Sequence, residues 1–253
     1  MDFVVMAFGL LIGSFLNVCI YRIPRDESVV FPGSRCPDCG ARLKPVDLVP
    51  VISFLLLKGR CRYCNRPISW RYPLVETLTA CLMWLFYRHY GITIMAAYYA
   101  FIGCLLVVVA FIDLSHQEIP NGLVLALMIV GLVAKLAGIG AGVVDGLYGL
   151  LVGGAPLVLI AVISVLALRR EGMGGGDIKL MAAVGWCLGW RLTAITLILS
   201  VYIGGLVALM LLCFKIKGRK DYIPYGPFIA LSAIISMLWG ERILYWYISS
   251  FWG

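Results

Sequence analysis

The sequence predicts an all-α membrane protein, a polytopic bundle of about eight transmembrane helices with a small cytoplasmic module. Of its 253 residues, 62% are hydrophobic and only 13% are charged, whereas a soluble domain usually carries about a quarter charged residues. Uncharged stretches such as residues 146–168 can span a bilayer, and a soluble fold would have no way to cover them. The polar sequence is concentrated in residues 22–72, which form the predicted module.

The candidate spans are apolar runs separated by polar, glycine or proline breaks. They cover residues 3–20, 73–87, 93–112, 121–137, 146–168, 178–190, 192–214 and 225–250. The two runs that flank Arg191 lie so close together that they can merge. The first run is followed by Arg22 and Arg25 instead of a small-residue cleavage site, so we expect a retained helix and not a signal peptide.

The basic residues predict how the bundle is oriented. Of the 21 Lys and Arg residues, ten lie in residues 22–72, three in 169–179 and four in 215–220. The remaining four fall on the other side of the predicted spans: Arg88, Lys135, Arg191 and Arg242. Because cytoplasmic loops carry an excess of Lys and Arg, the module and the loops after residues 112 and 168 are expected in the cytoplasm, with both chain ends outside. The net charge of +8 then reflects topology in the cell inner membrane and not nucleic-acid binding.

Four of the nine cysteines form two C-x-x-C pairs in the module, Cys36 with Cys39 and Cys61 with Cys64. Each pair can offer two thiolates to one tetrahedral ion, which predicts a structural zinc closed by four protein ligands. Two disulfides or four free thiols are the alternatives, and the reducing cytoplasm disfavours disulfides. The other cysteines lie in apolar runs, where we expect inert packing roles: Cys19, Cys81, Cys104, Cys187 and Cys213.

Two carboxylates lie beside apolar runs on the predicted cytoplasmic side. Asp113 follows one apolar run. Asp177 follows the glycine-rich segment 174–176 and precedes another apolar run. An ionised carboxylate at the hydrocarbon boundary loses hydration, so each is expected to share a proton with a neighbour or to lie in a wet cavity. Two facing carboxyl groups that share one proton can activate water and protonate a peptide carbonyl, which is the chemistry of an aspartic protease.

Structural roles are the alternative for these acids. Asp177 would cap the helix that follows it, and Asp113 would be a helix-end residue in the interface. Glu118 could replace Asp113 as the carboxylate and ranks third. The glycines also suit a phosphate-binding turn, but no Walker lysine follows them. His89 and His116 lack the partners that a metal site or a nucleophile triad requires.

Seven blocks along the chain form a set. They are Gly13-Ser14-Phe15-Leu16-Asn17-Val18, Tyr21-Arg22-Ile23-Pro24, the two C-x-x-C pairs, Arg71-Tyr72-Pro73-Leu74-Val75-Glu76, the segment 113–121, Gly174-Gly175-Gly176-Asp177-Ile178-Lys179-Leu180 and Pro224-Tyr225-Gly226-Pro227. In this order they resemble the type IV prepilin peptidases over nearly the whole chain. The Gly-x-Gly-Asp pattern alone would be weak, whereas its occurrence with the other six blocks is very specific.

The resemblance implies both a reaction and the residues that perform it. It assigns catalysis to Asp113 and Asp177 at the cytoplasmic face of the membrane. The implied substrate is a prepilin or pseudopilin whose short basic leader ends in glycine before an apolar helix, and the cut falls just after that glycine. Met173 stands where the family often has phenylalanine, which leaves both acids in place.

The resemblance also implies a second activity, the methylation of the new amino terminus with S-adenosylmethionine. Residues 1–75, the first helix with the zinc module, are then the methyltransferase part, and residues 76–253 are the membrane-embedded peptidase part. Gly59 and Glu76 stand at family motif positions and are candidates for supporting methylation, although a turn and a helix boundary would also explain them. No glycine-rich nucleotide fingerprint marks the donor site.

Two other classes of protein compete with this prediction. A small transporter would use Asp113 and Asp177 to relay protons or to bind a cation, which explains the acids but not the cysteine module. A non-enzymatic assembly scaffold would use the module to bind a partner protein. Cleavage of a prepilin that depends on both acids would distinguish the peptidase from either rival.

Overall fold

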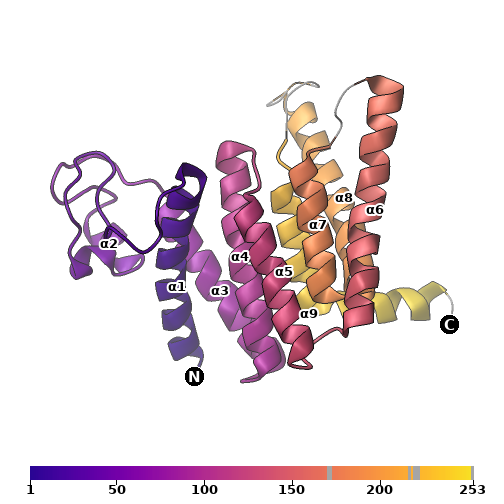
Figure 1. The fold of residues 1–253 in the computed structure, drawn as a ribbon. Helices are drawn as coiled ribbons and strands as arrows, with labels where there is room; N and C mark the ends of the chain where they lie inside the picture. Colours follow the sequence, from indigo (N-terminus) through magenta and orange to yellow (C-terminus); the bar gives the residue numbers. More distant parts are fainter. Residues whose placement is uncertain (170–172, 216–217, 219–222, 252–253) are drawn as a thin grey trace. The chain divides into compact units, whose positions relative to one another are not determined.

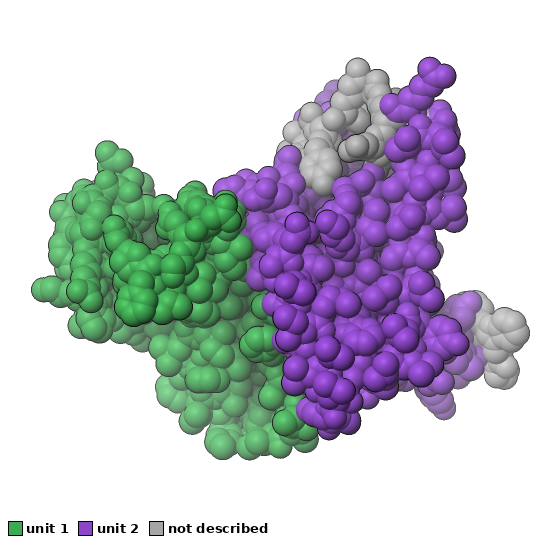
Figure 2. Space-filling model, viewed as in Figure 1, with its two compact units in different colours: residues 1–108 green, residues 109–253 purple. Residues whose placement is uncertain are grey.

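The regular structure of the chain is helical. The computed structural model describes residues 1–169, 173–215, 218 and 223–251. Within these residues the β-type pairings are two isolated bridges in the cysteine module, Arg35 with Arg42 and Arg60 with Pro67. The prediction of an all-α fold is therefore confirmed for the described residues. The chain divides into two compact units, residues 1–108 and 109–253 (Figure 2).

Unit 1 holds the cysteine module and the helices on either side of it. These helices are α1 (Asp2–Arg22), α3 (Arg71–Tyr90) and the larger part of α4 (Ile94–His116) (Figure 1). The module contains little regular structure: the short helix α2 (Ile52–Leu56) and two single 3-10 turns, Ile23–Arg25 and Pro45–Leu48. A loop segment this small needs a further constraint to hold one conformation.

Two glycines allow α1 to pack closely against α3. A Cβ atom on Gly9 would lie 2.6 Å from the Cα atom of Ala80, and one on Gly13 would lie 2.6 Å from the Cα atom of Glu76. Small residues at this spacing let helix backbones approach each other within a membrane, where packing replaces the hydrophobic effect as the main attraction. The contact places Glu76 against Gly13 of α1, and Gly13 lies one helical turn before Asn17.

Unit 2 consists of the end of α4 and five further helices (Figure 1). They are α5 (Asn121–Leu136), α6 (Val143–Leu168), α7 (Gly175–Leu188), α8 (Trp190–Cys213) and α9 (Gly226–Phe251). α7 and α8 are separated only by Gly189, whose φ of +80° suits glycine. The predicted break at Arg191 is therefore two residues late, because the chain turns at the glycine.

Five helices in the described residues are long and apolar enough to cross a membrane. Four are α4, α6, α8 and α9, and the fifth is α1 with the turn that follows it. α5 and α7 are shorter, at 16 and 14 residues. α3 has 20 residues but carries charged side chains near both ends. The membrane character predicted from composition is thus confirmed.

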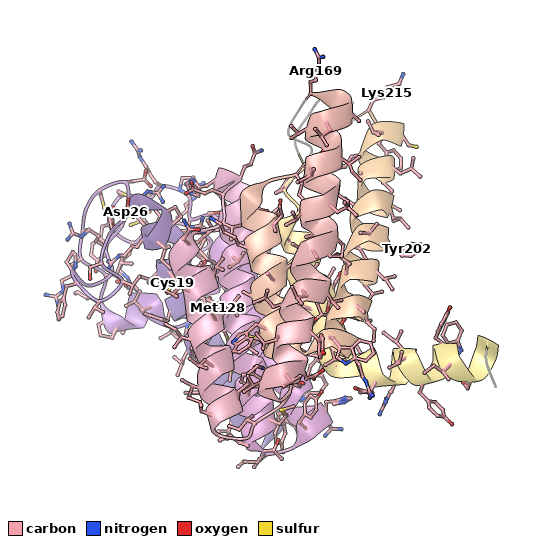
Figure 3. The ribbon with its side chains drawn as sticks, turned by 45° about the vertical axis from the view of Figure 1, so that its right-hand side comes forward. Cys19, Asp26, Met128, Arg169, Tyr202 and Lys215 are labelled. Carbon is pink, nitrogen blue, oxygen red and sulfur yellow. The ribbon has the colours of Figure 1, made fainter. Side chains whose placement is uncertain are left out.

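The C-terminal ends of α6 and α8 lie at one end of unit 2. Arg169 caps α6 and Lys215 follows α8, and Figure 3 shows both at this end. Because α7 follows α6 and α9 follows α8, these helices begin at the same end (Figure 1). The first turns of α7 and α9 therefore lie at the end of unit 2 where Arg169 and Lys215 are found.

Glycines also set the contact between α6 and α7. A Cβ atom on Gly149 of α6 would overlap the carbonyl oxygen of Gly185 in α7, and one on Gly153 would lie 2.5 Å from the carbonyl oxygen of Met181. The two backbones are thus close enough that only glycine fits between them. This contact fixes where α7, and with it Asp177, lies in unit 2.

A larger side chain at this contact is expected to weaken unit 2. Gly185→Val should lower the thermal unfolding midpoint by several degrees, since overpacking typically costs about 1–3 kcal/mol. Gly205→Val on α8 is the control, because no atom lies within 4 Å of a Cβ placed there. Circular dichroism of the detergent-solubilised protein measures both midpoints. Equal midpoints for the two variants would show that the α6 and α7 contact is not tight.

Candidate active site and cysteine module

Two carboxyl groups from different helices come together in unit 2. Asp113 lies in the last turn of α4, and Asp177 is the third residue of α7. Both side chains are buried, with exposed fractions of 1% for Asp113 and 4% for Asp177. The two carboxyl groups lie close enough to interact electrostatically. The structure therefore brings together the two acids that were predicted from widely separated parts of the chain.

Asp177 is not the N-cap of its helix. α7 begins at Gly175 with Gly174 as the N-cap, and no side-chain capping hydrogen bond forms. The Asp177 backbone N–H donates to the Gly174 carbonyl at 3.2 Å, so residue 177 is already within the first turn. The capping alternative is therefore wrong, because the helix starts three residues before the predicted span. A negative charge is nevertheless favoured in this turn by the helix dipole.

The glycine segment brings the start of α7 close to the start of α5. A Cβ atom on Gly176 would lie only 3.2 Å from the Cβ atom of Ile119, whereas the position of a Cβ on Gly175 is open. One turn later, the Lys179 ammonium donates to the Asn121 side-chain oxygen at 3.2 Å. These contacts hold the turn that carries the second acid.

The start of α9 supplies a contact that the sequence argument missed. The Gly226 backbone N–H donates to Asp113 Oδ2 at 2.9 Å. A Cβ atom at residue 226 would lie 2.7 Å from that same oxygen, so glycine is the residue that leaves room for the carboxyl group. The available signal was the glycine set between two prolines in the block 224–227, to which no role was given.

A tyrosine of the same block also lies near the acids. The Tyr225 hydroxyl is 2.7 Å from Ser200 Oγ of α8, and the charge of Asp177 acts on this tyrosine. Ser200 is fully buried. The carboxyl pair is thus bordered by residues of α8 and α9 as well as by α4 and α7.

The other polar candidates lie apart from this buried pair. His116 is exposed at the end of α4, Glu118 is exposed in the segment that follows, and His89 is exposed in the last turn of α3, against the Tyr90 ring. Burial therefore favours Asp113 over Glu118 as the partner of Asp177.

The four module cysteines converge as their spacing predicts. Their sulfur atoms lie within 4.8 Å of one another, and Cys36 Sγ and Cys64 Sγ are 4.0 Å apart. A tetrahedral zinc with Zn–S distances of about 2.3 Å separates its sulfurs by about 3.8 Å, so this donor set fits the ion. None of the four is joined in a disulfide, so the disulfide alternative does not form.

The two C-x-x-C pairs adopt the same local fold. In each pair the first cysteine N–H donates to a carbonyl five residues later, that of Ala41 for Cys36 and that of Arg66 for Cys61, both at 2.9 Å. Backbone N–H groups of Tyr63 and Cys64 lower the pKa of Cys61 to about 7, which favours the thiolate that binds metal. The Arg62 guanidinium pairs with Asp47 at 2.7 Å and ties the second pair to the adjacent 3-10 turn.

The remaining cysteines divide into two groups. Cys19, Cys104 and Cys187 are buried, as expected for packing residues. Cys81 and Cys213 are exposed on the surfaces of α3 and α8, so the expectation of packing within the protein is wrong for these two. Apolar runs of membrane helices leave one face outward, which their hydrophobicity alone does not reveal.

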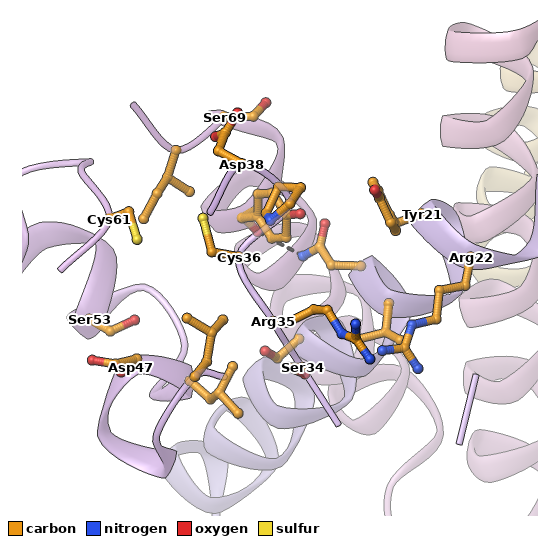
Figure 4. A pocket seen from close by; sticks show the side chains of 18 of the residues that line it. Tyr21, Arg22, Ser34, Arg35, Cys36, Asp38, Asp47, Ser53, Cys61 and Ser69 are labelled. Carbon is orange, nitrogen blue, oxygen red and sulfur yellow. Dashed lines mark hydrogen bonds between the residues drawn. The ribbon is translucent and has the colours of Figure 1, made fainter. Parts of the chain in front are cut away.

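A cavity of about 1110 Å³ lies within unit 1, between the ends of α1 and α3 and the cysteine module (Figure 4). Glu76 lines it, is 7% exposed and accepts the Val51 N–H at 2.7 Å. Gly59 is outside the lining and forms a turn with a φ of +67°. A Cβ atom there would lie 3.2 Å from the ring of Phe54, which does line the cavity.

Two protein-family models match this chain, each in a different part of it. The model of the bacterial peptidase A24 N-terminal domain matches residues 7–90, and that of the type IV leader peptidase family matches residues 99–209. A prepilin leader peptidase/N-methyltransferase of Legionella pneumophila is 37% identical over 273 residues, covering 98% of this chain and 94% of the relative. The chain belongs to the type IV leader peptidase family.

Other members of the type IV leader peptidase family show similar likeness. Proteins of the same name from Pseudomonas aeruginosa and Bacillus subtilis are 34% and 35% identical to this chain. The alignments cover 93% of this chain and 89% of the first relative, and 97% of both chains for the second. No solved structure matches. Asp113 and Asp177 both fall in the part matched by the leader peptidase model.

The geometry of the four thiols predicts a measurable metal content. Elemental analysis of the purified protein should find about one zinc per chain, and Cys61→Ser should lower this value because one of four ligands is lost. Cys213→Ser removes an exposed thiol of α8 and should leave the zinc content unchanged. Zinc bound equally well by both variants would rule out the four-cysteine site.

Proposed function

We propose that this protein is a membrane aspartic endopeptidase that cleaves the leader of type IV prepilins or pseudopilins after glycine, and that it then methylates the new amino terminus. The observation that carries the proposal is the buried pair of Asp113 and Asp177 in a member of the type IV leader peptidase family. Relatives named prepilin leader peptidase/N-methyltransferase align over almost the whole chain, which supports both activities. The family assignment offers no support for a transporter.

The two acids act as one unit during peptide hydrolysis. One carboxylate takes a proton from water, whose oxygen attacks the carbonyl carbon of the glycine that ends the leader, while the other carboxyl group gives its proton to the carbonyl oxygen. The tetrahedral intermediate collapses, the carbon–nitrogen bond breaks and the leaving nitrogen takes a proton from the pair. The Gly226 N–H holds one oxygen of Asp113 in place throughout. Because the two groups interact, the proton belongs to the pair and not to one named residue.

The site is assigned to the cytoplasmic face of the cell inner membrane. Arg169 after α6 and Lys215 after α8 lie at the end of unit 2 where α7 and α9 begin, which supports this orientation. In the proposed topology α3, α5 and α7 join the five long apolar helices to make about eight spans. A prepilin with a basic leader and an apolar helix would then meet the acids at the membrane boundary.

The cysteine module is assigned a structural zinc. Cys36, Cys39, Cys61 and Cys64 would supply four thiolates, which leave no open position for a catalytic water. The ion would therefore stabilise the fold of residues 22–72 and take no part in peptide hydrolysis.

Methylation is assigned to residues 1–75 and peptide hydrolysis to residues 76–253. When bound, S-adenosylmethionine supplies an electrophilic methyl group for the amino terminus that cleavage exposes. Glu76 lines the unit 1 cavity with a fixed carboxylate, and Gly59 keeps the turn behind the wall residue Phe54. These placements support a role for both in methylation, with Gly59 acting through the shape of the wall.

Removing either acid should abolish cleavage. Asp113→Asn and Asp177→Asn keep the shape of the side chain but cannot exchange the proton, so we expect losses of at least about 100-fold each. Mass spectrometry of a prepilin incubated with membranes measures the cleavage. Glu118→Gln is the matched control and should retain activity, because Glu118 is exposed. Processing that survives in either aspartate variant would refute the assignment.

Adding one methyl group at residue 226 should also impair cleavage. Gly226→Ala places a carbon against Asp113 Oδ2, so the carboxyl group must move and the rate should fall roughly 10- to 100-fold. Gly122→Ala is the control, since residue 122 also lies at a helix start but has open space around it. The same cleavage assay compares them. Full activity of Gly226→Ala would mean that Asp113 does not need its position beside α9.

A further inference from the structure

The cavity of unit 1 is lined by residues 14–76 alone, so it belongs to the N-terminal part of the chain and contains neither acid of the carboxyl pair. At about 1110 Å³ it exceeds the roughly 300–1,000 Å³ of common small-molecule sites. Charged and polar side chains from α1, the module and α3 surround it (Figure 4). A cavity of this size and polarity can hold a molecule that carries several polar groups.

One acceptor in the lining lacks a partner. Asn17 is 2% exposed, and its Nδ2 atom donates to the Gly13 carbonyl at 3.3 Å and to the Tyr72 carbonyl at 3.0 Å. These two bonds fix which way the amide faces, because both of its N–H groups are used. The Oδ1 atom is buried and accepts no hydrogen bond from a described residue. A buried polar atom without a hydrogen-bond partner in the protein is usually satisfied by a bound water or ligand.

One donor in the lining is also without a partner. The Nε atom of Arg71 is buried and has no hydrogen-bond acceptor among the described residues. Arg71 directly precedes Tyr72 in the chain, and the Tyr72 carbonyl accepts a hydrogen bond from Asn17. Three other arginines of the lining are already engaged: Arg22 with the Ser28 and Pro32 carbonyls, Arg62 with Asp47 and Arg66 with Asp38.

We propose that the unit 1 cavity is the methyl-donor site, and that Arg71 and Asn17 bind the amino-acid end of S-adenosylmethionine. The inference rests on the proposed methyltransferase function. An α-amino acid presents a carboxylate next to an ammonium group, and the lining presents an unpartnered guanidinium donor and an unpartnered amide acceptor that are connected through Tyr72. The carboxylate accepts from Arg71, and the ammonium donates to Asn17 Oδ1. Glu76 adds to the wall a carboxyl group held in place by the Val51 N–H, which suits a ligand that carries a positive sulfur.

Two nucleosides that differ only in the amino-acid end provide the sharpest test. S-adenosylhomocysteine carries this end, and 5′-methylthioadenosine lacks it. Isothermal titration of the full-length protein in nanodiscs measures both affinities. In Arg71→Gln and Asn17→Leu we expect the dissociation constant for S-adenosylhomocysteine to rise about tenfold or more, and that for methylthioadenosine to change less than about twofold. Unchanged binding of methylthioadenosine also shows that the cavity is still folded.

Arg60→Gln is the matched control, because Arg60 belongs to the same module but lies outside the cavity lining. It should bind both nucleosides as the unsubstituted protein does. If Arg71→Gln and Asn17→Leu bind S-adenosylhomocysteine with unchanged affinity, the donor site lies elsewhere and the inference is overturned, while methylation can stand. If the unsubstituted protein cleaves a prepilin but never methylates the product, the proposed methyltransferase function fails, and the inference fails with it.

Discussion

The burial of two interacting carboxyl groups is the constraint on which unit 2 depends. A buried carboxylate is unfavourable unless it is hydrogen-bonded or shares a proton, and two such groups within range of each other make separate ionisation harder still. Asp113 accepts the Gly226 N–H, and Asp177 lies in the first turn of α7, where the helix dipole favours negative charge. The ends of α4, α7 and α9 must therefore meet at one place.

The glycines of unit 2 make sense under this constraint. Gly149 and Gly185 let α6 and α7 approach, Gly176 lets α7 approach the chain before α5, and Gly226 leaves room for the first acid. Each allows a backbone to come closer than any side chain would permit. In unit 1 the same device joins α1 to α3 through Gly9 and Gly13, and it places Glu76 beside the cavity. Glycine thus shapes both proposed sites without contributing a side chain.

Much of the fold could be predicted because hydrophobic runs and cysteine spacing are local signals. The apolar runs correspond to helices, and the two C-x-x-C pairs converge. The start of α7 was missed because Gly174 to Gly176 have weak intrinsic helix propensity, whereas in the structure the helix already begins at Gly175, and Gly176 lies against Ile119. The helical extension of α4 past residue 112 was missed because polar residues end a hydrophobic run before they end a helix.

The site itself depended on contacts that no local pattern contains. The depth of Asp113 and Asp177 followed from topology, but their convergence required the packing of helices that are distant in the chain. The bond from Gly226 to Asp113 and the unpartnered atoms of Asn17 and Arg71 likewise appear only in the folded structure. Contacts between side chains of different helices leave no recognisable pattern in the sequence around either residue.

Cross-linking tests the meeting of the two acids most directly. Asp113→Cys combined with Asp177→Cys, treated with a short bifunctional thiol reagent and analysed by mass spectrometry, should give the peptide pair that joins residues 113 and 177. Asp113→Cys with Asp145→Cys should not, because Asp145 lies beside Gly189, about 20 Å along α7 from residue 177. If the 113 and 177 pair fails to form while other cysteines in the same sample react, the two side chains do not share a site, and the account of this protein as an aspartic peptidase is contradicted.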